Sequence, residues 1–157
     1  MSRDPRRKDR AISDDEARAV LDQGEYGILA TVDAEGQPYA VPLSYILYDN
    51  ALYVHCALKG HKVDNIEANP KVSFCVVGPT EPVCHENGFS TFYESCVVFG
   101  TARVVPDGQE KHDALYALTR KYFPEEDESV ERAITRHGPA TLVYAISLDR
   151  VTGKAKR

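Results

Sequence analysis

Residues 26–57 read YGILATVDAEGQPYAVPLSYILYDNALYVHCA, and this pattern predicts a meander of three antiparallel strands. Three runs rich in β-branched and aromatic residues are separated by two short polar turns, AEGQ and DN. Such runs, joined by turns that contain Gly or Asn, are typical of β-hairpins. We expect the strands over 26–33, 38–49 and 51–57.

Pro42 lies inside the second of these runs. Because proline has no N–H for the ladder, it predicts a strand edge, a bulge or an opening of the sheet, with room for another molecule to bind. The alternation of side chains places Pro42 and Ser44 on one face and Val41, Leu43 and Tyr45 on the other. An ordinary barrel wall would show the same alternation, so both interpretations stay open.

Upstream of the meander, residues 1–12 are polar and basic, and we expect them to form an arm over the body of the protein. Ser13 and Glu16 have the spacing of a capping box, which predicts that a helix begins at Ser13. Gly24 is expected to end this helix in the C′ position.

Downstream, the pattern predicts a short helix, two strands, two further helices and a last strand. The polar segment 79–91 is expected to form a loop between the two strands, and Asp107 is expected to cap the longer helix. The expected elements are a helix start at KGHK (59–62), strands over 71–78 and 92–105, helices over 109–123 and 127–137, and a strand over 140–153.

These elements indicate a mainly β protein with flanking helices, built around a six-stranded antiparallel sheet that closes into a barrel. The 157 residues suit a single domain, which we place at 13–157, after the arm at 1–12. A barrel of six strands is too small to enclose a large ligand. A planar cofactor would therefore bind at a mouth of the barrel or at a dimer seam.

The composition of the chain restricts its partners. The net charge of −5 and the pI near 5.5 argue against nucleic acid and against a membrane surface. The charged N-terminus MSRDPRRKDR lacks the apolar stretch of a secretory signal, so we expect a cytoplasmic protein. The four cysteines form no CxxC pair, so we expect reduced thiols and no metal site. A metal site at the adjacent residues Cys84 and His85 is a weak alternative.

The first candidate site is KGHK (59–62), at the expected start of the short helix. Gly60 lets the backbone approach a ligand closely, and a helix start offers free N–H groups and the positive end of the helix dipole. Lys59, His61 and Lys62 add cationic donors, and together these groups suit a phosphate monoester. A solvated basic turn is the competing interpretation.

The second candidate site is HCA (55–57), which ends the third strand and leads into KGHK. His55 would either face a cofactor or form a hydrogen bond within the core. The sequence contains no GxGxxG, GxxxxGK[ST], HExxH or GxSxG motif. A Rossmann or P-loop nucleotide site and a hydrolase with a standard motif are therefore disfavoured.

Three long segments, taken in order, resemble the pyridoxamine 5′-phosphate oxidase-related flavoproteins, which are FMN-binding split barrels, and in particular their nitroimidazole-resistance branch. The segments are GILATVDAEGQPYAVPLSY, LYVHCALKGHKVDNIEANPKVSF and STFYESCVVFGTARVV. The resemblance covers nearly the whole chain. It is specific because YAVPLSY, GHK, NP, YES and VTGK occur together in the expected order.

The resemblance implies a split β-barrel that forms a homodimer with two FMN sites at the interface. It implies that the phosphate lies at 60–62, that 55–57 runs beside the phosphate and ribityl chain, and that 41–45 lies along the isoalloxazine ring. Residues near 94–96 of the partner's long strand would approach the flavin. The cofactor-binding residues implied in this way are Val41, Pro42, Leu43, Ser44, Tyr45, His55, Cys56, Ala57, Gly60, His61, Lys62, Glu94, Ser95 and Cys96.

The resemblance also implies a flavin-dependent oxidoreductase that passes two electrons from reduced FMN to a small-molecule acceptor such as a 5-nitroimidazole. No catalytic side chain is assigned, although Tyr45, His55 and His61 are candidates for proton delivery. The alternatives left open are a non-enzymatic flavin or haem carrier or sensor, and a deazaflavin in place of FMN. The ending SLDRVTGKAKR lacks the late Arg and His residues with which true pyridoxamine phosphate oxidases hold their substrate, which argues against vitamin B6 synthesis.

Overall fold

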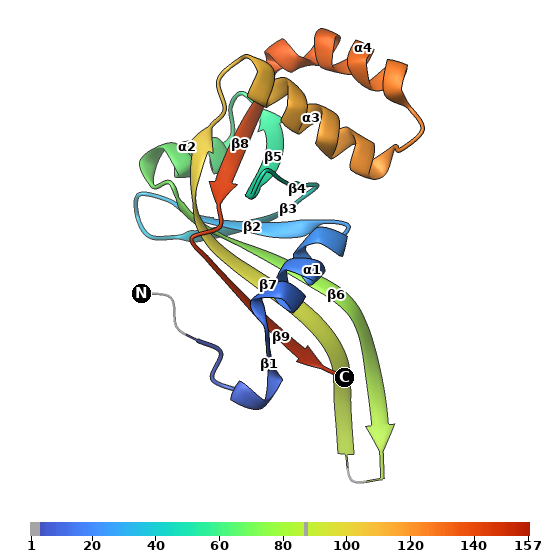
Figure 1. Ribbon diagram of the computed structural model, residues 1–157. Helices are drawn as coiled ribbons and strands as arrows, with labels where there is room; N and C mark the ends of the chain where they lie inside the picture. The colour runs from blue at the N-terminus through green and yellow to red at the C-terminus, as the bar shows by residue number, and fades with distance from the viewer. Residues whose placement is uncertain (1–3, 87) are drawn as a thin grey trace.

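A long, bent antiparallel sheet forms the body of the protein, with helices at its sides (Figure 1). The computed structural model describes residues 4–86 and 88–157, and none of the helices in these ranges has the length and apolar character needed to cross a membrane. The helices are α1 (Asp14–Gln23), α2 (His61–Ala68), α3 (Gln109–Tyr122) and α4 (Asp127–His137), with 3-10 helices η1 (Lys8–Arg10) and η2 (Gly138–Ala140). The strands are β1 (Ala11–Ile12), β2 (Gly27–Val32), β3 (Pro38–Leu43), β4 (Ile46–Tyr48), β5 (Ala51–Ala57), β6 (Lys71–His85), β7 (Gly88–Val104), β8 (Thr141–Ser147) and β9 (Arg150–Lys156).

The strands follow the order β3-β2-β6-β7-β8-β5-β4, and each pair of neighbours is antiparallel. β9 also pairs with β7, and β1 pairs with β9. β7 joins the two halves of the sheet, because residues 93–99 pair with β9 and residues 102–104 pair with β8. The expected mainly β fold, with an antiparallel sheet and flanking helices, is therefore confirmed.

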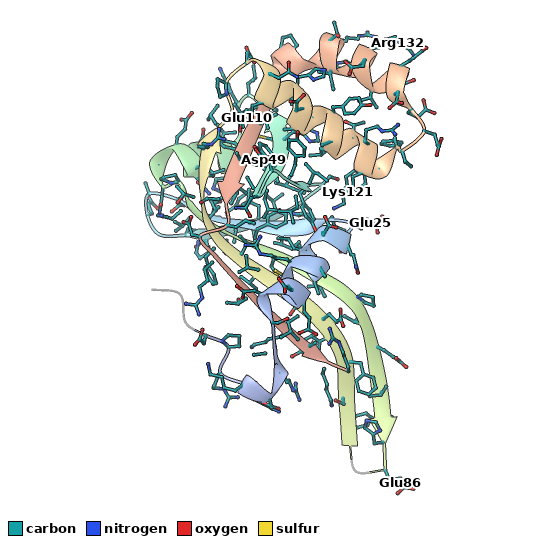
Figure 2. All side chains as sticks on the ribbon, viewed as in Figure 1. Glu25, Asp49, Glu86, Glu110, Lys121 and Arg132 are labelled. Carbon is teal, nitrogen blue, oxygen red and sulfur yellow. The ribbon has the colours of Figure 1, made fainter. Side chains whose placement is uncertain are left out.

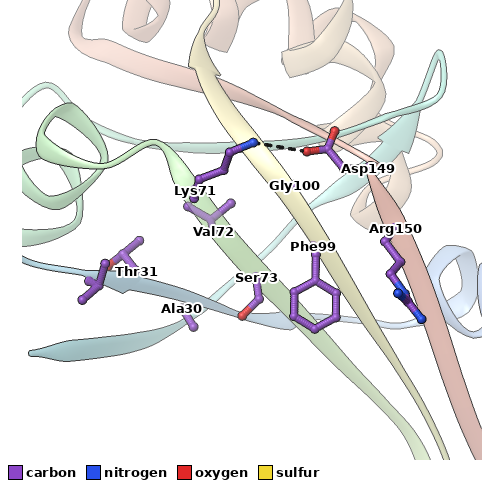
Figure 3. Close-up of a pocket in the computed structure, with 10 residues that line it drawn as sticks. Ala30, Thr31, Lys71, Val72, Ser73, Phe99, Gly100, Asp149 and Arg150 are labelled. Atoms are coloured by element: carbon purple, nitrogen blue, oxygen red, sulfur yellow. Dashed lines mark ion pairs between the residues drawn. The ribbon is translucent and has the colours of Figure 1, made fainter. Parts of the chain in front are cut away.

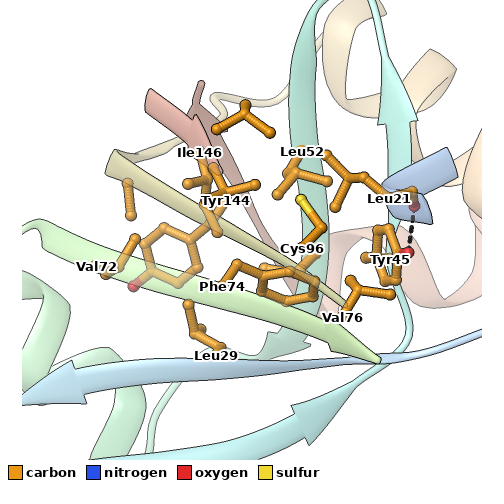
Figure 4. Packing of buried hydrophobic residues seen from close by; sticks show 14 of the residues in the cluster. Leu21, Leu29, Tyr45, Leu52, Val72, Phe74, Val76, Cys96, Tyr144 and Ile146 are labelled. Atoms are coloured by element: carbon orange, nitrogen blue, oxygen red, sulfur yellow. Dashed lines mark hydrogen bonds between the residues drawn. The ribbon is translucent and has the colours of Figure 1, made fainter. Parts of the chain in front are cut away.

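The interior of the curved sheet is filled by its own side chains (Figure 4). Tyr45, Phe74 and Tyr144 have no exposed surface, and the ring of Tyr45 meets Phe74 edge-on with the ring centroids 4.9 Å apart. Leu21 brings α1 into the same cluster. Each large apolar side chain buried in this way stabilises the fold by roughly 1.5–3 kcal/mol.

The segment 79–91, expected to be a loop, is instead the outer part of a long hairpin (Figure 1). β6 and β7 stay paired as far as His85 and Gly88, with a register shift between Val77 and Thr80. Asn87 lies outside the described residues. The prediction was wrong because this part of the hairpin projects into solvent. Its two strands stay paired through backbone hydrogen bonds, which do not require alternating apolar side chains.

Two of the expected strands are each divided in two. The chain bends at Ser44 and Tyr45 between β3 and β4, and at Leu148 and Asp149 between β8 and β9. These two divisions turn the six predicted strands into eight, and the short β1 (Ala11–Ile12), in the segment expected to be an arm, makes nine among the described residues. The division lets one run of sequence pair with two partners, since β3 pairs with β2 and β4 pairs with β5.

The capping box at the start of α1 is present. The Glu16 amide donates to Ser13 Oγ at 3.3 Å, and the Ser13 amide donates to Glu16 Oε2 at 3.0 Å. α1 ends at Gly24 as predicted, but Gly24 is the C-cap and not C′, and its φ of −62° is not left-handed. Glycine is needed there for close packing, since a Cβ would lie 2.3 Å from Cγ1 of Val76.

The cap predicted for α3 was also wrong. Gly108 occupies the N-cap position, with no side-chain cap. The Asp107 carboxylate accepts a hydrogen bond from Lys111 Nζ at 2.7 Å instead. A buried ammonium at this position competes for the carboxylate that would otherwise bond to the helix start.

A buried polar contact attaches α2 to the sheet. Asn65 Nδ2 donates to Thr31 Oγ1 at 3.0 Å, and the Thr31 hydroxyl donates to the Tyr39 carbonyl at 3.3 Å. Asn65 and Thr31 are both buried, and Val63 and Ile66 of α2 pack in the core. The contact fixes the middle of α2 against β2.

We expect the Asn65–Thr31 contact to produce a coupling energy in a double-mutant cycle. Asn65→Ala and Thr31→Val should each lower the free energy of unfolding by about 1–3 kcal/mol, because the first removes the donor to the buried Thr31 hydroxyl and the second leaves the buried Asn65 amide without its acceptor. The double variant should lose about 0.5–1.5 kcal/mol less than the sum of the two single losses. Urea unfolding measures this, with the exposed Glu67→Ala on the same helix as control. Strictly additive losses would contradict the contact.

Candidate functional site

The candidate site lies where the sheet is split between β3 and β5. The β4–β5 ladder stops at the Ile46–Tyr53 pair, and the preceding chain turns away from β5 to pair with β2 as β3. β5 continues to Ala57 with β8 along its other edge. Since β3 is an edge strand of the described sheet, the split leaves β3 and the end of β5 accessible to a ligand.

The predicted site residues on these two strands form an exposed set and a packed set. Only the exposed set can present side chains to a ligand, whereas the packed set can offer backbone groups. The alternation expected along β3 is present. The exposed members are Pro42, Ser44, His55 and Ala57, and the packed members are Val41, Leu43, Tyr45 and Cys56.

The start of α2 closes one end of the split and presents free main-chain donors. The first helical hydrogen bonds run from the amides of Val63 and Asp64 to the Gly60 carbonyl, at 2.8 and 3.1 Å. The amides of His61 and Lys62 precede these bonds and point out of the helix start. Gly60 has a φ of 141°, which only glycine adopts readily, and a Cβ there would meet nothing within 4 Å. The space in front of the helix is therefore open to an anion.

Lys62, in the first turn of α2, is partly buried. Burial raises the pKa of the Cys56 thiol, and the charge of Lys62 opposes that rise. The charge of Lys62 in the segment KGHK thus acts on the thiol of the segment HCA.

Two histidines lie beside this helix start. The exposed His61 ring packs against Tyr39 of β3, with the ring centroids 4.2 Å apart and the planes tilted by 32°. His55 is exposed on β5, and the partial burial of its imidazole lowers its pKa. Neutral His55 is therefore favoured at neutral pH, and it can both donate and accept a hydrogen bond.

The donors at the start of α2 fit a phosphate monoester. Main-chain amides, the Lys62 ammonium and the His61 ring are brought together just after Gly60, which is the combination that binds phosphate at a helix start. Within 4–86 and 88–157, no group of three or more His, Cys, Asp or Glu side chains is arranged to hold a metal ion. A ligand with a phosphate at one end and a flat ring at the other would match this arrangement, because the exposed residues of β5 and β3 extend from α2.

The remaining predicted residues, Glu94, Ser95 and Cys96, lie elsewhere. They are on the part of β7 that pairs with β9, next to the C-terminus and away from α2 (Figure 1). Arg157 Nε donates to Glu94 at 2.8 Å, and Cys96 is fully buried in the core. Within one chain, these three residues therefore do not lie at the split between β3 and β5.

A pocket of about 930 Å³ on the outer face of β2, β6, β7 and β9 was missed by sequence reasoning (Figure 3). Phe99 and Ser73 line it, and Lys71 and Asp149 form an ion pair of 3.7 Å across it. The signal that could have revealed this face is the run SCVVFG, which is apolar at both odd and even positions. Such runs are typical of strands that are covered on both faces.

The ladder register connects this outer face to the split. Pro42 pairs with Ile28, Ile28 with Cys75, and Cys75 with Val97, so these residues form one row across four strands. Directly paired residues point to the same side of a sheet. The face of β3 that is exposed in the split therefore continues into the apolar face that contains Phe99.

The chain is similar to known proteins over nearly its whole length. A sequence profile described as pyridoxamine 5′-phosphate oxidase matches residues 13–155. An uncharacterized protein from Rhizobium meliloti (strain 1021) is 28% identical over 153 residues, which cover 93% of this chain and 94% of that protein.

Two solved structures have a similar fold. One is a proposed 5-nitroimidazole antibiotic resistance protein from Bacteroides thetaiotaomicron VPI-5482, with 23% identity, a TM-score of 0.77, and coverage of 92% of this chain and 85% of that chain. The other is an FAD and haem binding protein from Mycobacterium smegmatis, with 22% identity, a TM-score of 0.80, and coverage of 92% and 72%. At these identities the likeness establishes the fold, which is the split barrel implied by the sequence resemblance.

Proposed function

The chain belongs to the pyridoxamine 5′-phosphate oxidase family, and on this premise we propose that it is an FMN-dependent oxidoreductase. The observation that carries the proposal is the start of α2, where Gly60, His61 and Lys62 present donors for a phosphate at one end of the split. When bound, the flavin supplies the transfer of two electrons to a small acceptor. The protein binds the flavin, orients it and controls its surroundings.

Each exposed residue of the split has a role in this proposal. The amides after Gly60 and the Lys62 ammonium hold the phosphate. Ser44 offers a hydroxyl that can donate to or accept from the edge of the ring. His55, neutral at neutral pH, offers one ring N–H as a hydrogen-bond donor and the other ring nitrogen as an acceptor beside the ring. The likeness to the Bacteroides protein favours a nitroaromatic acceptor such as a 5-nitroimidazole.

A second candidate is a flavin or haem carrier or sensor without enzymatic activity. It is favoured by the fold likeness to the FAD and haem binding protein of Mycobacterium smegmatis. A haem would need an axial ligand, and His55 and His61 are exposed beside the split. The visible spectrum separates the candidates, because haem gives an intense Soret band and flavin does not.

The proposal includes a homodimer in which a second copy covers the apolar outer face. The row of Pro42, Ile28, Cys75 and Val97 is only partly covered within one chain, and Val77 beside it is 56% exposed. An apolar sheet face of this kind marks a contact with another protein surface. Because the same face reaches the split, the second copy would also supply the missing wall of the flavin site, with Glu94 of the partner subunit among the candidate residues.

We expect the purified protein to release one FMN per chain on denaturation, identified by mass and by fluorescence. The holoprotein, once reduced, should transfer electrons to members of a 5-nitroimidazole panel faster than free reduced FMN does. Release of a deazaflavin or of haem would contradict the choice of cofactor. A bound FMN without any acceptor reduction would favour the carrier or sensor.

We expect Val97→Lys to convert the dimer to a monomer, because it places a charge in an apolar interface, and a stable obligate dimer buries about 2,000 Å² or more. Analytical ultracentrifugation and flavin content measure the effect, and both dimer and flavin should be lost together. Val77→Lys, at an exposed position, should act in the same direction without disturbing the core. Val104→Lys, on the same strand as Val97 and 50% exposed, is the matched control and should stay dimeric. A wild-type monomer that retains stoichiometric flavin would refute the dimer.

We expect Lys62→Ala to weaken FMN binding by about tenfold to a hundredfold, because it removes a charge-assisted contact worth ~1.5–3 kcal/mol. Riboflavin, which has no phosphate, should bind wild type and Lys62→Ala almost equally. Titration followed by flavin fluorescence measures both ligands.

Lys59→Ala is the matched control for Lys62→Ala. Lys59 carries the same charge and lies before Gly60, but its side chain is exposed, so its loss should change FMN affinity much less. An equal effect of the two variants would mean that only the general positive charge matters. If Lys62→Ala loses riboflavin as well, Lys62 supports the fold and does not bind the phosphate.

A further inference from the structure

Tyr45, the residue at which β3 turns into β4, is held by elements outside the meander. Its hydroxyl donates to the Leu21 carbonyl of α1 (Figure 4). Its main-chain amide donates to the Tyr122 hydroxyl at 3.2 Å, and Lys121 Nζ lies 3.9 Å from the centroid of its ring. Backbone, ring and hydroxyl of one residue are therefore fixed by three different partners.

The same two residues of α3 also hold the end of α1. Lys121 Nζ donates to the Gly24 carbonyl at 2.7 Å, and the Tyr122 hydroxyl donates to the Glu25 carbonyl. Figure 2 shows Lys121 and Glu25 next to each other where the ends of α1 and α3 meet. The last turn of α1 contains no basic residue, so Lys121 supplies the cation that the negative end of the helix dipole favours. We call Tyr45, Lys121 and Tyr122 the latch.

The position of the latch connects it to the split. Tyr45 directly follows the exposed Ser44, at the point where the chain leaves the β4–β5 ladder. Since Tyr45 also packs edge-on against Phe74 in the core, it cannot shift without disturbing the barrel. Fixing Tyr45 therefore fixes the direction in which Pro42–Ser44 departs from β5, and with it the width of the split.

We propose that Lys121 and Tyr122 are positioning residues that hold the flavin-contacting strand through Tyr45, so that α3 sets the geometry of the ring end of the site. The inference rests on the proposed function, because it concerns the residues that would lie along the flavin ring. It assigns a role to α3, which lies outside the split and contributes no predicted ligand-binding residue.

The opposite side of α3 provides matched controls. The Tyr116 hydroxyl donates to Asp127 of α4 at 2.7 Å, and Arg120 pairs with the same carboxylate at 2.7 Å. These residues have the same chemical types as the latch residues, lie on the same helix, and bond to α4 in place of the barrel. Tyr122→Phe is therefore compared with Tyr116→Phe, and Lys121→Met with Arg120→Met.

The experiment measures flavin affinity and the visible spectrum of the bound flavin, at a temperature where all four variants are folded. Tyr122→Phe and Lys121→Met should weaken FMN and riboflavin alike, by about fivefold, and shift the flavin absorption bands. Tyr116→Phe and Arg120→Met should leave both unchanged. In flavin-free protein, the Tyr45 amide should exchange its hydrogen faster in Tyr122→Phe than in Tyr116→Phe, because only the former removes its acceptor.

Two failures are distinguishable. If wild type binds flavin and the latch variants lower only the melting temperature, with affinity, spectrum and Tyr45 exchange unchanged, the latch is structural and the inference is overturned while the proposed function stands. If wild type binds no flavin, the proposed function fails and the inference fails with it. A loss of FMN affinity without a loss of riboflavin affinity would also overturn it, because it would place the effect at the phosphate.

Discussion

The interior of this barrel is occupied by its own large side chains, and that constraint determines where a ligand can bind. Tyr45, Phe74 and Tyr144 have no exposed surface. Because successive residues of a strand face opposite sides, the demand that Leu29 of β2 face inward also fixes Ile28 outward. A slip of one residue in register would exchange the two faces, so the filled core fixes the outer surface as firmly as the inner one.

Because side chains fill the interior, the candidate site lies at the split between β3 and β5. Pro42 lacks the N–H that a central strand needs, so β3 is suited to remain an edge strand. If β3 continued the ladder along β5, the edges that now flank the exposed residues would be paired and the surface would close. The hydrogen bond between Asn65 and Thr31 holds α2 on β2, at the end of that opening. An edge that would otherwise invite aggregation thus becomes a place for a ligand.

The parts that the sequence predicted depend on contacts between near neighbours. The capping box joins Ser13 and Glu16 across three positions, and Gly60 precedes a helix start whose donors follow it directly. The hairpins of the meander have the same local character. Composition and spacing carry this information, because the interacting groups lie within a few residues of one another.

The parts that the sequence did not predict depend on contacts between distant residues. Gly24 is required by its packing against Val76, and Asp107 is diverted by the buried Lys111, and neither effect is visible in a local pattern. The outer part of the β6–β7 hairpin is polar because solvent surrounds it, so its composition suggested a loop. Glu94 on β7 was assigned to the site from family resemblance alone, and no pattern in this chain tests it.

The two ends of the candidate site differ in the same way. The phosphate end is made by a run of adjacent residues, Gly60–Lys62, and depends little on the rest of the fold beyond the anchoring of α2. The proposed ring end depends on Tyr45, whose partner Tyr122 is 77 positions away in sequence. Lys121, which lies over the Tyr45 ring, also bonds to the Gly24 carbonyl, 97 positions away from it. A local motif can keep its geometry while distant packing changes. Substitutions in α3 are therefore expected to alter the surroundings of a bound ring while leaving the proposed phosphate end intact.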